Sequence, residues 1–281
     1  MKCLKSFAAA ATSVAAALLL VACGGNSDGT PNVPPPSAAA DKPAENKEPT
    51  GTIRGHVVLK GDMPKPGTDS ITADPKICGT QVSLPRIVVG ADKGVEDTFV
   101  FLEGGPSSGS ARATASTKTV LIDQKSCQYK PHALIVPVGS SVEIVNSDPI
   151  LHNVHGKHDG SNIFNYAQPK QGERQSVETK NMTEGIVTLT CEAGHPWMNA
   201  FMYVTKDPSF VAITDKSGEF VIKDVPPGTY TLKMWHEGVQ LKKINKTLQT
   251  YDYESPYEIS QMVTVTANNE ATVNFDFTLR K

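Results

Sequence analysis

The sequence carries almost no net charge, few aromatic side chains and no apolar run long enough for a confident membrane span. Lys and Arg number 27 against 29 Asp and Glu, so the formal net charge is −2. Without a strong basic excess, the chain lacks the surface that binds a nucleic-acid backbone. Phe, Tyr and Trp make up only 6% of its residues. We therefore expect no nucleic-acid partner.

What recurs instead is Val, Ile and Thr, with glycine and proline between them. This mixture favours strands and turns over helices. A length of 281 residues suits one large or two modest domains, each able to bury a core.

The N-terminal segment has the pattern of an export signal. Lys2 and Lys5 are followed by an apolar run of Ala, Val and Leu that ends at Val21. The run closes with Leu20-Val21-Ala22-Cys23, which resembles a bacterial lipobox. The resemblance implies that residues 1–22 are removed and that Cys23 is lipidated. The alternative is an ordinary signal peptide with an incidental cysteine.

The residue after that cysteine is Gly24 rather than aspartate, which resembles lipoproteins sent on to the outer membrane. We therefore expect a lipid-anchored protein of the bacterial cell envelope, facing the periplasm or the cell surface. Residues 23–50 are rich in Pro and Ala and lack apolar periodicity, so they are expected to form a flexible tether. As a coil the tether would reach roughly 30 Å.

From residue 51 onward the sequence consists of short apolar segments separated by turn residues. Many short strands of this kind predict an all-β chain with antiparallel sandwiches or barrels. The strands expected in the first domain, residues 51–205, are 52–59, 98–102, 119–122, 133–138, 141–145, 185–191 and 200–205.

The C-terminal segment, residues 206–281, is predicted to form a second, smaller sandwich. Its last strand alternates Val273, Phe275 and Phe277 with polar residues, so one face is buried. The stretch TDKSGEFVIKDVPPGTYTLKMWHE, residues 214–237, resembles the carboxypeptidase regulatory-like or transthyretin-like β-sandwich. That resemblance concerns the fold and says little about chemistry.

Candidate metal ligands gather in two stretches of the first domain. CEAGHPWM, residues 191–198, holds a thiol, an imidazole and a thioether: Cys191, His195 and Met198. NSDPILHN, residues 146–153, follows an apolar strand and adds His152. Thiolate suits Cu(I), imidazole suits both copper oxidation states, and a weak axial thioether tunes the potential.

These two stretches, in this order, resemble the cupredoxins, the small blue-copper proteins that include plastocyanins and amicyanins. The resemblance implies a Greek-key β-sandwich holding one copper ion through His152, Cys191, His195 and Met198. The HPWM segment is similar to the amicyanin loop but has one residue more between Cys and His. The same spacing occurs in the dicopper domain of cytochrome oxidase subunit II, yet Val187 stands where that site needs a second cysteine.

Some nearby residues have other expected roles. Glu192 is an alternative to Met198 as the fourth ligand. His155 and His158 are expected to be solvated loop residues, with an accessory metal contact as the alternative. Phe164, Trp197 and Phe201 are candidates for an apolar shell around the metal. His195 is expected at the exposed edge of the site.

The remaining cysteines suggest a crosslink. With Cys23 lipidated and Cys191 assigned to the metal, Cys78 and Cys127 most simply pair, because exported proteins favour disulfides. A loop of this length would stabilise the fold by roughly 4 kcal/mol on the chain-entropy model. The alternative is a second metal site using Cys127 and His132.

The sequence thus predicts an envelope-anchored copper protein that passes single electrons between redox partners such as a cytochrome or a dehydrogenase, and not an enzyme. One alternative is copper delivery. The methionines are scattered along the chain, which argues against a methionine-rich delivery site. A second is an enzyme with Cys191 as nucleophile and His195 as base. A third is a structural two-domain β lipoprotein with a vestigial copper site.

Overall fold

A computed structural model describes residues 48–280 apart from Pro66, Pro85, Ala91, 106–118 and 246–249. The predicted signal peptide, Cys23 and most of the predicted tether lie outside the described residues. Within them, the all-β prediction is confirmed, because helix is confined to α1 (Pro75–Cys78) and a 3₁₀ turn, η1 (Pro208–Phe210). None of the described helices is long and apolar enough to cross a bilayer.

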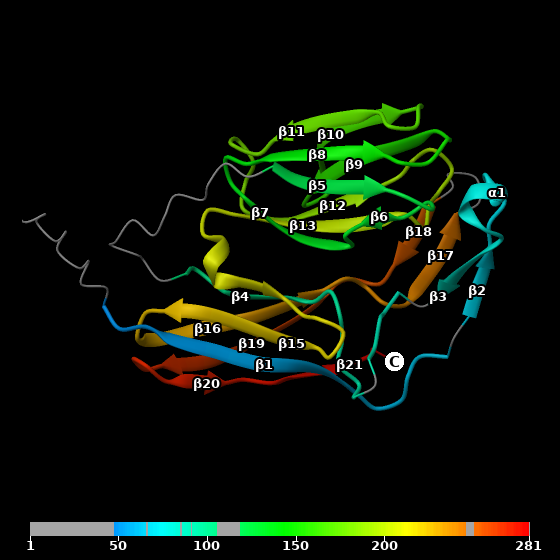
Figure 1. Cartoon of the computed structure of the whole chain (residues 1–281). Helices are drawn as coiled ribbons and strands as arrows, with labels where there is room; N and C mark the ends of the chain where they lie inside the picture. Colours follow the sequence, from blue (N-terminus) through cyan, green and yellow to red (C-terminus); the bar gives the residue numbers. More distant parts are fainter. Residues whose placement is uncertain are drawn as a thin grey trace, which may run out of the picture. The chain divides into compact units, whose positions relative to one another are not determined.

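The strands form two sandwiches and two separate hairpins (Figure 1). The strands are β1 (Gly51–Lys60), β2 (Gly67–Ser70), β3 (Gln81–Leu84), β4 (Phe99–Leu102), β5 (Thr119–Gln124), β6 (Tyr129–Lys130), β7 (Ala133–Pro137), β8 (Ser141–Asn146), β9 (His152–His158), β10 (Ser161–Gln168), β11 (Arg174–Glu178), β12 (Gly185–Thr190), β13 (Asn199–Thr205), β14 (Val211–Ile213), β15 (Glu219–Val225), β16 (Gly228–His236), β17 (Leu241–Asn245), β18 (Thr250–Tyr253), β19 (Tyr257–Val265), β20 (Glu270–Thr272) and β21 (Phe275–Thr278).

The first sandwich, here the site sandwich, comprises β5 to β13. One sheet has the order β10-β9-β12-β13-β7 and the other β11-β8-β5-β6. Both contribute alternate side chains to one apolar core, as strand geometry requires. On β12, Val187 and Leu189 are fully buried, and Cys191, two residues further on, continues that inward face. The predicted phase of this strand is therefore confirmed.

The second sandwich does not follow the predicted boundary between residues 205 and 206. Its sheets are β15-β1-β20, with β21 also pairing β1, and β14-β4-β16-β19. Two strands predicted for the first domain, β1 and β4, therefore belong to the C-terminal sandwich. The reason is packing: alternate residues of β1 are buried among Phe220, Phe275 and Phe277. Residue alternation shows that a strand has a buried face but not which sandwich buries it.

The two sandwiches pack against each other through an aromatic cluster. Phe201 of β13 contacts Trp235 of β16 with ring centroids 5.0 Å apart. Phe99 and Phe101 of β4 face the same cluster. Phe201 was predicted to shield the metal, and that prediction is wrong. Strand alternation points Ala200 and Met202 into the site sandwich and turns Phe201 outward, against the second sandwich.

The β2–β3 hairpin carries α1 at its tip and is crosslinked to the site sandwich. Cys78, the last residue of α1, forms the predicted disulfide with Cys127, with the two Cα atoms 5.1 Å apart. The prediction of this disulfide is confirmed. Because Cys127 has its sulfur in the disulfide, the alternative metal site of Cys127 and His132 is excluded.

Candidate metal centre

The three strongest predicted ligands meet at one end of the site sandwich. His152 begins β9 and Cys191 directly follows β12, and these two strands are antiparallel neighbours. The pairing brings the start of one strand beside the end of the other. The backbone N–H of Asn153 donates to the Cys191 sulfur at 3.4 Å.

The donor atoms lie close together and away from solvent. The Cys191 sulfur is 3.6 Å from His195 Nδ1 and 4.0 Å from His152 Nδ1. The two imidazole rings have centroids 4.8 Å apart. Both histidines are 0% exposed and Cys191 is 4% exposed. These three side chains form a buried cluster of one sulfur and two imidazoles that is able to hold a metal ion.

The loop from residue 191 to 198 folds back on itself. Gly194 adopts a φ of 88°, which only glycine takes without strain. The N–H of Met198 donates to the carbonyl of His195 at 2.9 Å, and the N–H of Cys191 donates to the carbonyl of Met198 at 3.3 Å. Met198 is 1% exposed and shares the core of Cys191. The loop therefore returns Met198 to the strand end that carries the thiol.

Each histidine is oriented by a carboxylate behind it. His152 Nε2 lies 2.9 Å from Asp148 Oδ2, and His195 Nε2 lies 3.1 Å from Asp74 Oδ2. A carboxylate accepts the Nε2 proton, which leaves the Nδ1 lone pair of each ring facing Cys191. Carboxylates behind imidazoles are the usual arrangement at metal sites, since they fix the tautomer and raise ligand basicity.

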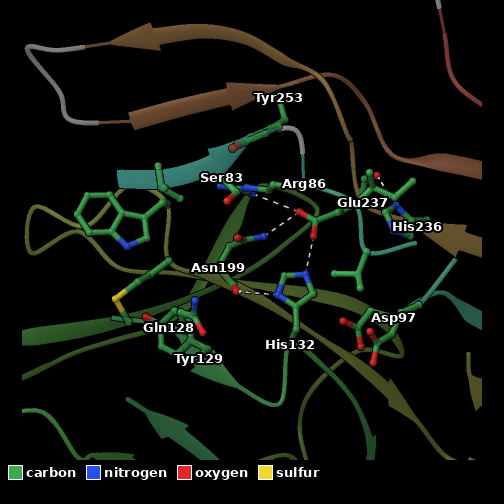
Figure 2. A pocket seen from close by; sticks show the side chains of 16 residues that line it. Ser83, Arg86, Asp97, Gln128, Tyr129, His132, Asn199, His236, Glu237 and Tyr253 are labelled. Carbon is green, nitrogen blue, oxygen red and sulfur yellow. Dashed lines mark hydrogen bonds and ion pairs between the residues drawn. The ribbon is translucent and has the colours of Figure 1, made fainter. Parts of the chain in front are cut away.

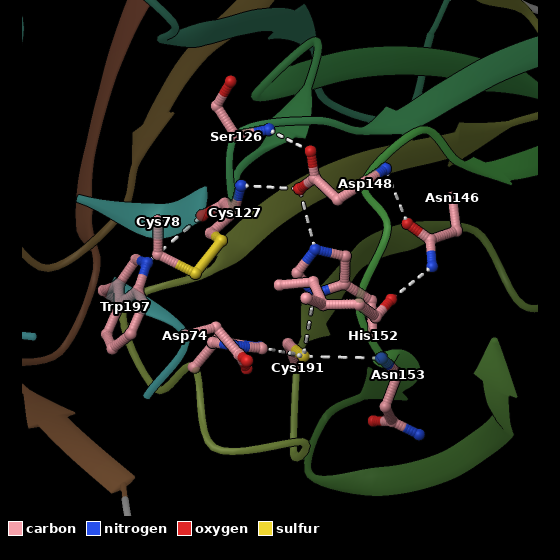
Figure 3. Close-up of a disulfide and its surroundings, with 12 residues drawn as sticks. Asp74, Cys78, Ser126, Cys127, Asn146, Asp148, His152, Asn153, Cys191 and Trp197 are labelled. Atoms are coloured by element: carbon pink, nitrogen blue, oxygen red, sulfur yellow. Dashed lines mark hydrogen bonds and ion pairs between the residues drawn. A yellow bond between two sulfur atoms is a disulfide. The ribbon is translucent and has the colours of Figure 1, made fainter. Parts of the chain in front are cut away.

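Asp148 is held by the loop that carries the disulfide (Figure 3). Its carboxylate accepts the N–H groups of Ser126 at 2.8 Å and Cys127 at 2.9 Å. Burial opposes ionisation of this carboxyl, but these bonds and the one from His152 outweigh it, so the pKa of Asp148 is lowered. The side chain of Asn146 accepts the N–H of Asp148. The Asn-Ser-Asp motif thus builds the support behind His152.

The ionisation of the cluster suits a soft or borderline metal ion. Burial raises the pKa of the Cys191 thiol, although backbone hydrogen bonds oppose that rise. Burial and the nearby His152 lower the pKa of His195, which favours its neutral ring. A thiol with a raised pKa gives up its proton when a metal binds, since the thiolate is the ligand. Two imidazoles and one thiolate form a donor set that copper accepts.

The site is covered, which corrects the prediction that His195 forms an exposed edge. His195 has no exposed surface. Asp74, at the start of α1, hydrogen-bonds its outer nitrogen, and Trp197 packs edge-on against its ring at 5.4 Å between centroids. Trp197 also donates its indole N–H to the carbonyl of Cys127 at 3.1 Å. Trp197 therefore lies at the site as predicted, whereas Asp74 was missed.

The other histidines and Glu192 serve different contacts. His155 is 5% exposed on β9, so the prediction of a solvated loop residue is wrong for it. Its Nδ1 lies 2.6 Å from Glu192 Oε1 and its Nε2 2.8 Å from Asn162 Oδ1. His158 is also on β9, with Nε2 3.6 Å from an oxygen of Asp159. Glu192 is therefore engaged by His155 rather than by the cluster of Cys191, His152 and His195.

A second polar cluster lies beside the loop of residues 191–198, where the two sandwiches meet (Figure 2). Glu237 Oε1 is 2.5 Å from His132 Nε2, and Glu237 Oε2 is 3.2 Å from Arg86 Nη1. Asn199, the residue after Met198, donates its amide to the same carboxylate at 2.8 Å. Burial opposes ionisation of Glu237, yet the charges of His132 and Arg86 lower its pKa to about 2. The cluster lines a pocket of about 290 Å³.

Comparison with solved structures finds cupredoxins and a copper enzyme. The copper-containing nitrite reductase NirK from Thermus scotoductus SA-01 is 23% identical, with a TM-score of 0.28, over 37% of this chain and 26% of that chain. The purple cupredoxin from Nitrosopumilus maritimus is 25% identical, with a TM-score of 0.26, over 31% and 99%. A reduced amicyanin mutant is 20% identical, with a TM-score of 0.28, over 38% and 91%.

The chain spans about a quarter of the length of the nitrite reductase. No match was found among curated proteins. The family model described as "Polysaccharide lyase family 4, domain II" matches residues 179–273, which is less than half of the chain. The transthyretin-like resemblance of residues 206–281 stays a prediction.

Proposed function

We propose that the chain is a mononuclear copper protein that carries single electrons between partners in the bacterial cell envelope. The observation that carries the proposal is the buried cluster of Cys191, His152 and His195, with each Nε2 bonded to a carboxylate. Copper would supply a one-electron couple at a centre that this chain holds rigid. The ligands would be these three side chains, with Met198 as the weak fourth donor.

Rigidity supports electron transfer because a centre that is fixed in advance needs little rearrangement when its charge changes. His152 is tied through Asp148 to two backbone N–H groups, and Cys191 accepts a backbone N–H from Asn153. All of the proposed donors are 4% exposed or less, so water is excluded from them. The chain therefore orients its donors before any metal is present and shields them from exchange with water.

A specific observation also favours a second function, that of a cysteine hydrolase. Cys191, His195 and Asp74 lie in the order of a nucleophile, a base and an orienting carboxylate. Two features argue against it. Burial raises the pKa of the thiol, whereas a nucleophilic cysteine needs a lowered one. The arrangement also leaves a second buried imidazole, that of His152, facing the sulfur without a role.

The test is copper content and colour of the purified protein. We expect one copper per chain and an intense visible band from thiolate-to-copper charge transfer. Cys191→Ser should abolish the band, and His152→Gln should weaken both band and binding. His158→Gln is the matched control, because it changes a histidine of the same strand outside the cluster and should leave both unchanged. A colourless copper-loaded protein, or preferential zinc binding with copper available, would refute the electron-carrier function.

We further propose that the chain is anchored to the envelope through lipidated Cys23 and the tether of residues 23–50. The support is the lipobox resemblance together with the confirmed disulfide, which suits an exported protein. The redox partners are proposed to be envelope proteins such as a cytochrome or a dehydrogenase, and no catalysis is proposed for the chain itself.

A further inference from the structure

The segment Ile71–Thr80, here the cap, lies at the tip of the β2–β3 hairpin and covers the metal centre. Among the described residues, β2 and β3 pair only with each other. A two-stranded hairpin is marginally stable in water unless it packs on something else. The position of the cap must therefore come from contacts outside its own sheet.

Among the described residues, apolar packing, one side-chain hydrogen bond and the disulfide join the cap to the site sandwich. Ile71 is 7% exposed, and Ile77 is partly buried against the core of the site sandwich. Asp74 bonds to His195, but its side chain is 44% exposed, so water competes for that bond. The covalent attachment is the disulfide from Cys78 to Cys127 (Figure 3). The disulfide is thus the strongest link between the cap and the site.

The same disulfide lies next to both supporting carboxylates. The N–H of Cys78 donates to the carbonyl of Asp74 at 2.9 Å, and Asp74 orients His195. The N–H of Cys127 donates to the carboxylate of Asp148, which orients His152. The sulfur atoms of the disulfide and a nitrogen of His195 all lie within 4.8 Å of one another. A change at this bond therefore reaches both histidines.

We propose that the Cys78–Cys127 disulfide is a thiol–disulfide exchange site, and that its reduction by a dithiol protein releases the cap and opens the metal centre. The inference rests on the proposed copper function. The redox state of the disulfide would decide whether His195 is sealed, as here, or available to a docking partner and to metal exchange.

The chemistry balances as an ordinary exchange. Cys78 is partly exposed and Cys127 is fully buried, so Cys78 is the half of the disulfide that an incoming thiolate would attack. A mixed disulfide forms there while the bond to Cys127 breaks, and the sulfur of Cys127 takes up a proton. The second thiol of the reductant then displaces Cys78, and the reductant leaves as a disulfide. Two electrons and two protons pass to the chain.

The test compares the full-length wild-type protein with the double variant Cys78→Ser/Cys127→Ser. In the copper-free proteins, alkylation of Cys191 by iodoacetamide is followed by peptide mapping. We expect alkylation at least about tenfold faster in the double variant, because the cap no longer excludes the reagent. Ser83→Ala, an exposed change on β3, is the control and should react at the wild-type rate.

The loaded proteins give a second readout. Transfer of Cu(I) to a colorimetric chelator should be about tenfold faster in the double variant, and also in Asp74→Asn, which keeps the disulfide, because loss of a supporting partner typically costs 10–100-fold in metal affinity. Wild-type protein reduced with dithiothreitol should behave like the double variant, which guards against a folding defect.

Equal alkylation rates for wild-type, reduced and double-variant proteins would overturn the exchange-site proposal. If the wild-type protein binds no copper but its Cys191 is alkylated faster after reduction or in the double variant, the proposed function is overturned and the inference about the cap stands. The two failures are therefore distinguishable.

Discussion

Glu237→Gln tests whether the buried polar cluster fixes the two sandwiches together. The carboxylate accepts from His132, Arg86 and Asn199, and it is only 7% exposed. Glutamine keeps one acceptor but loses the charge that faces two cations. Removing one partner of a buried ion pair typically costs about 3–5 kcal/mol. Arg86 and His132 retain 17% and 32% of their side-chain exposure, so the low end applies.

The pKa gives an independent estimate of the same size. The pKa of Glu237 falls from 4.5 to about 2, and each unit corresponds to about 1.4 kcal/mol, so the carboxylate contributes about 3 kcal/mol. Because the pKa is depressed on folding, this stability is present above pH 4.5 and is lost as the pH falls toward 2. The variant should be about 3 kcal/mol less stable at pH 7, and the difference should shrink with acidification.

The assay is urea unfolding at several pH values between 7 and 2.5. Glu258→Gln is the matched control, because Glu258 is 50% exposed and pairs with Lys233 at the surface. Its cost should stay below about 1 kcal/mol. The reasoning would be refuted if the free energy of unfolding of Glu237→Gln lay within 1 kcal/mol of the wild-type value at pH 7. It would also be refuted if the difference between the two proteins did not shrink as the pH falls.

The remaining predictions concern the site and the anchor. Asp148→Asn leaves one backbone N–H without an acceptor, so it should lower the free energy of unfolding by about 1–3 kcal/mol at pH 7, measured by urea titration. That loss should shrink as the pH falls below about 4 and through the lowered pKa of Asp148, because a depressed pKa stabilises fully only above the unfolded value; a loss at pH 2 as large as at pH 7 would contradict it. Met198→Leu should keep one copper and a strong band while the potential rises in voltammetry, because losing a donor destabilises Cu(II) more than Cu(I); copper loss as severe as in His152→Gln would make Met198 a principal ligand and favour copper delivery. Cys23→Ala should release the protein from membranes in fractionation, since acyl chains contribute about 0.8 kcal/mol for each buried methylene; an unmodified mature N-terminus elsewhere would end the anchoring proposal.

The sequence was informative wherever chemistry and spacing coincide within a short stretch. Cys191, His195 and Met198 lie within eight consecutive positions, and strand alternation correctly predicted that the thiol points inward. The disulfide followed from counting cysteines in a chain predicted to be exported. Local patterns of this kind can be interpreted without knowledge of the fold.

What the sequence could not show are partners that meet only after folding. Asp74 and His195 are 121 residues apart, and no local sequence pattern around either residue predicts their contact. Glu237 lies 105 residues from His132 and 151 from Arg86, so the second cluster had no sequence signal either. The prediction that His195 is exposed failed for the same reason, because it was based on the sequence of its loop alone.

The placement of β1 has a consequence for synthesis and engineering. Strand β1 is the first of the described elements in the chain, yet it pairs with β15, β20 and β21, all of which follow the site sandwich in the chain. The site sandwich lies between them in the chain and is complete once residue 205 has emerged. The candidate-site residues on the site sandwich can therefore assemble before β1 has found its neighbours. A fragment starting at residue 206 would lack β1 and β4, leaving β15, β16 and β21 with unpaired edges that invite aggregation.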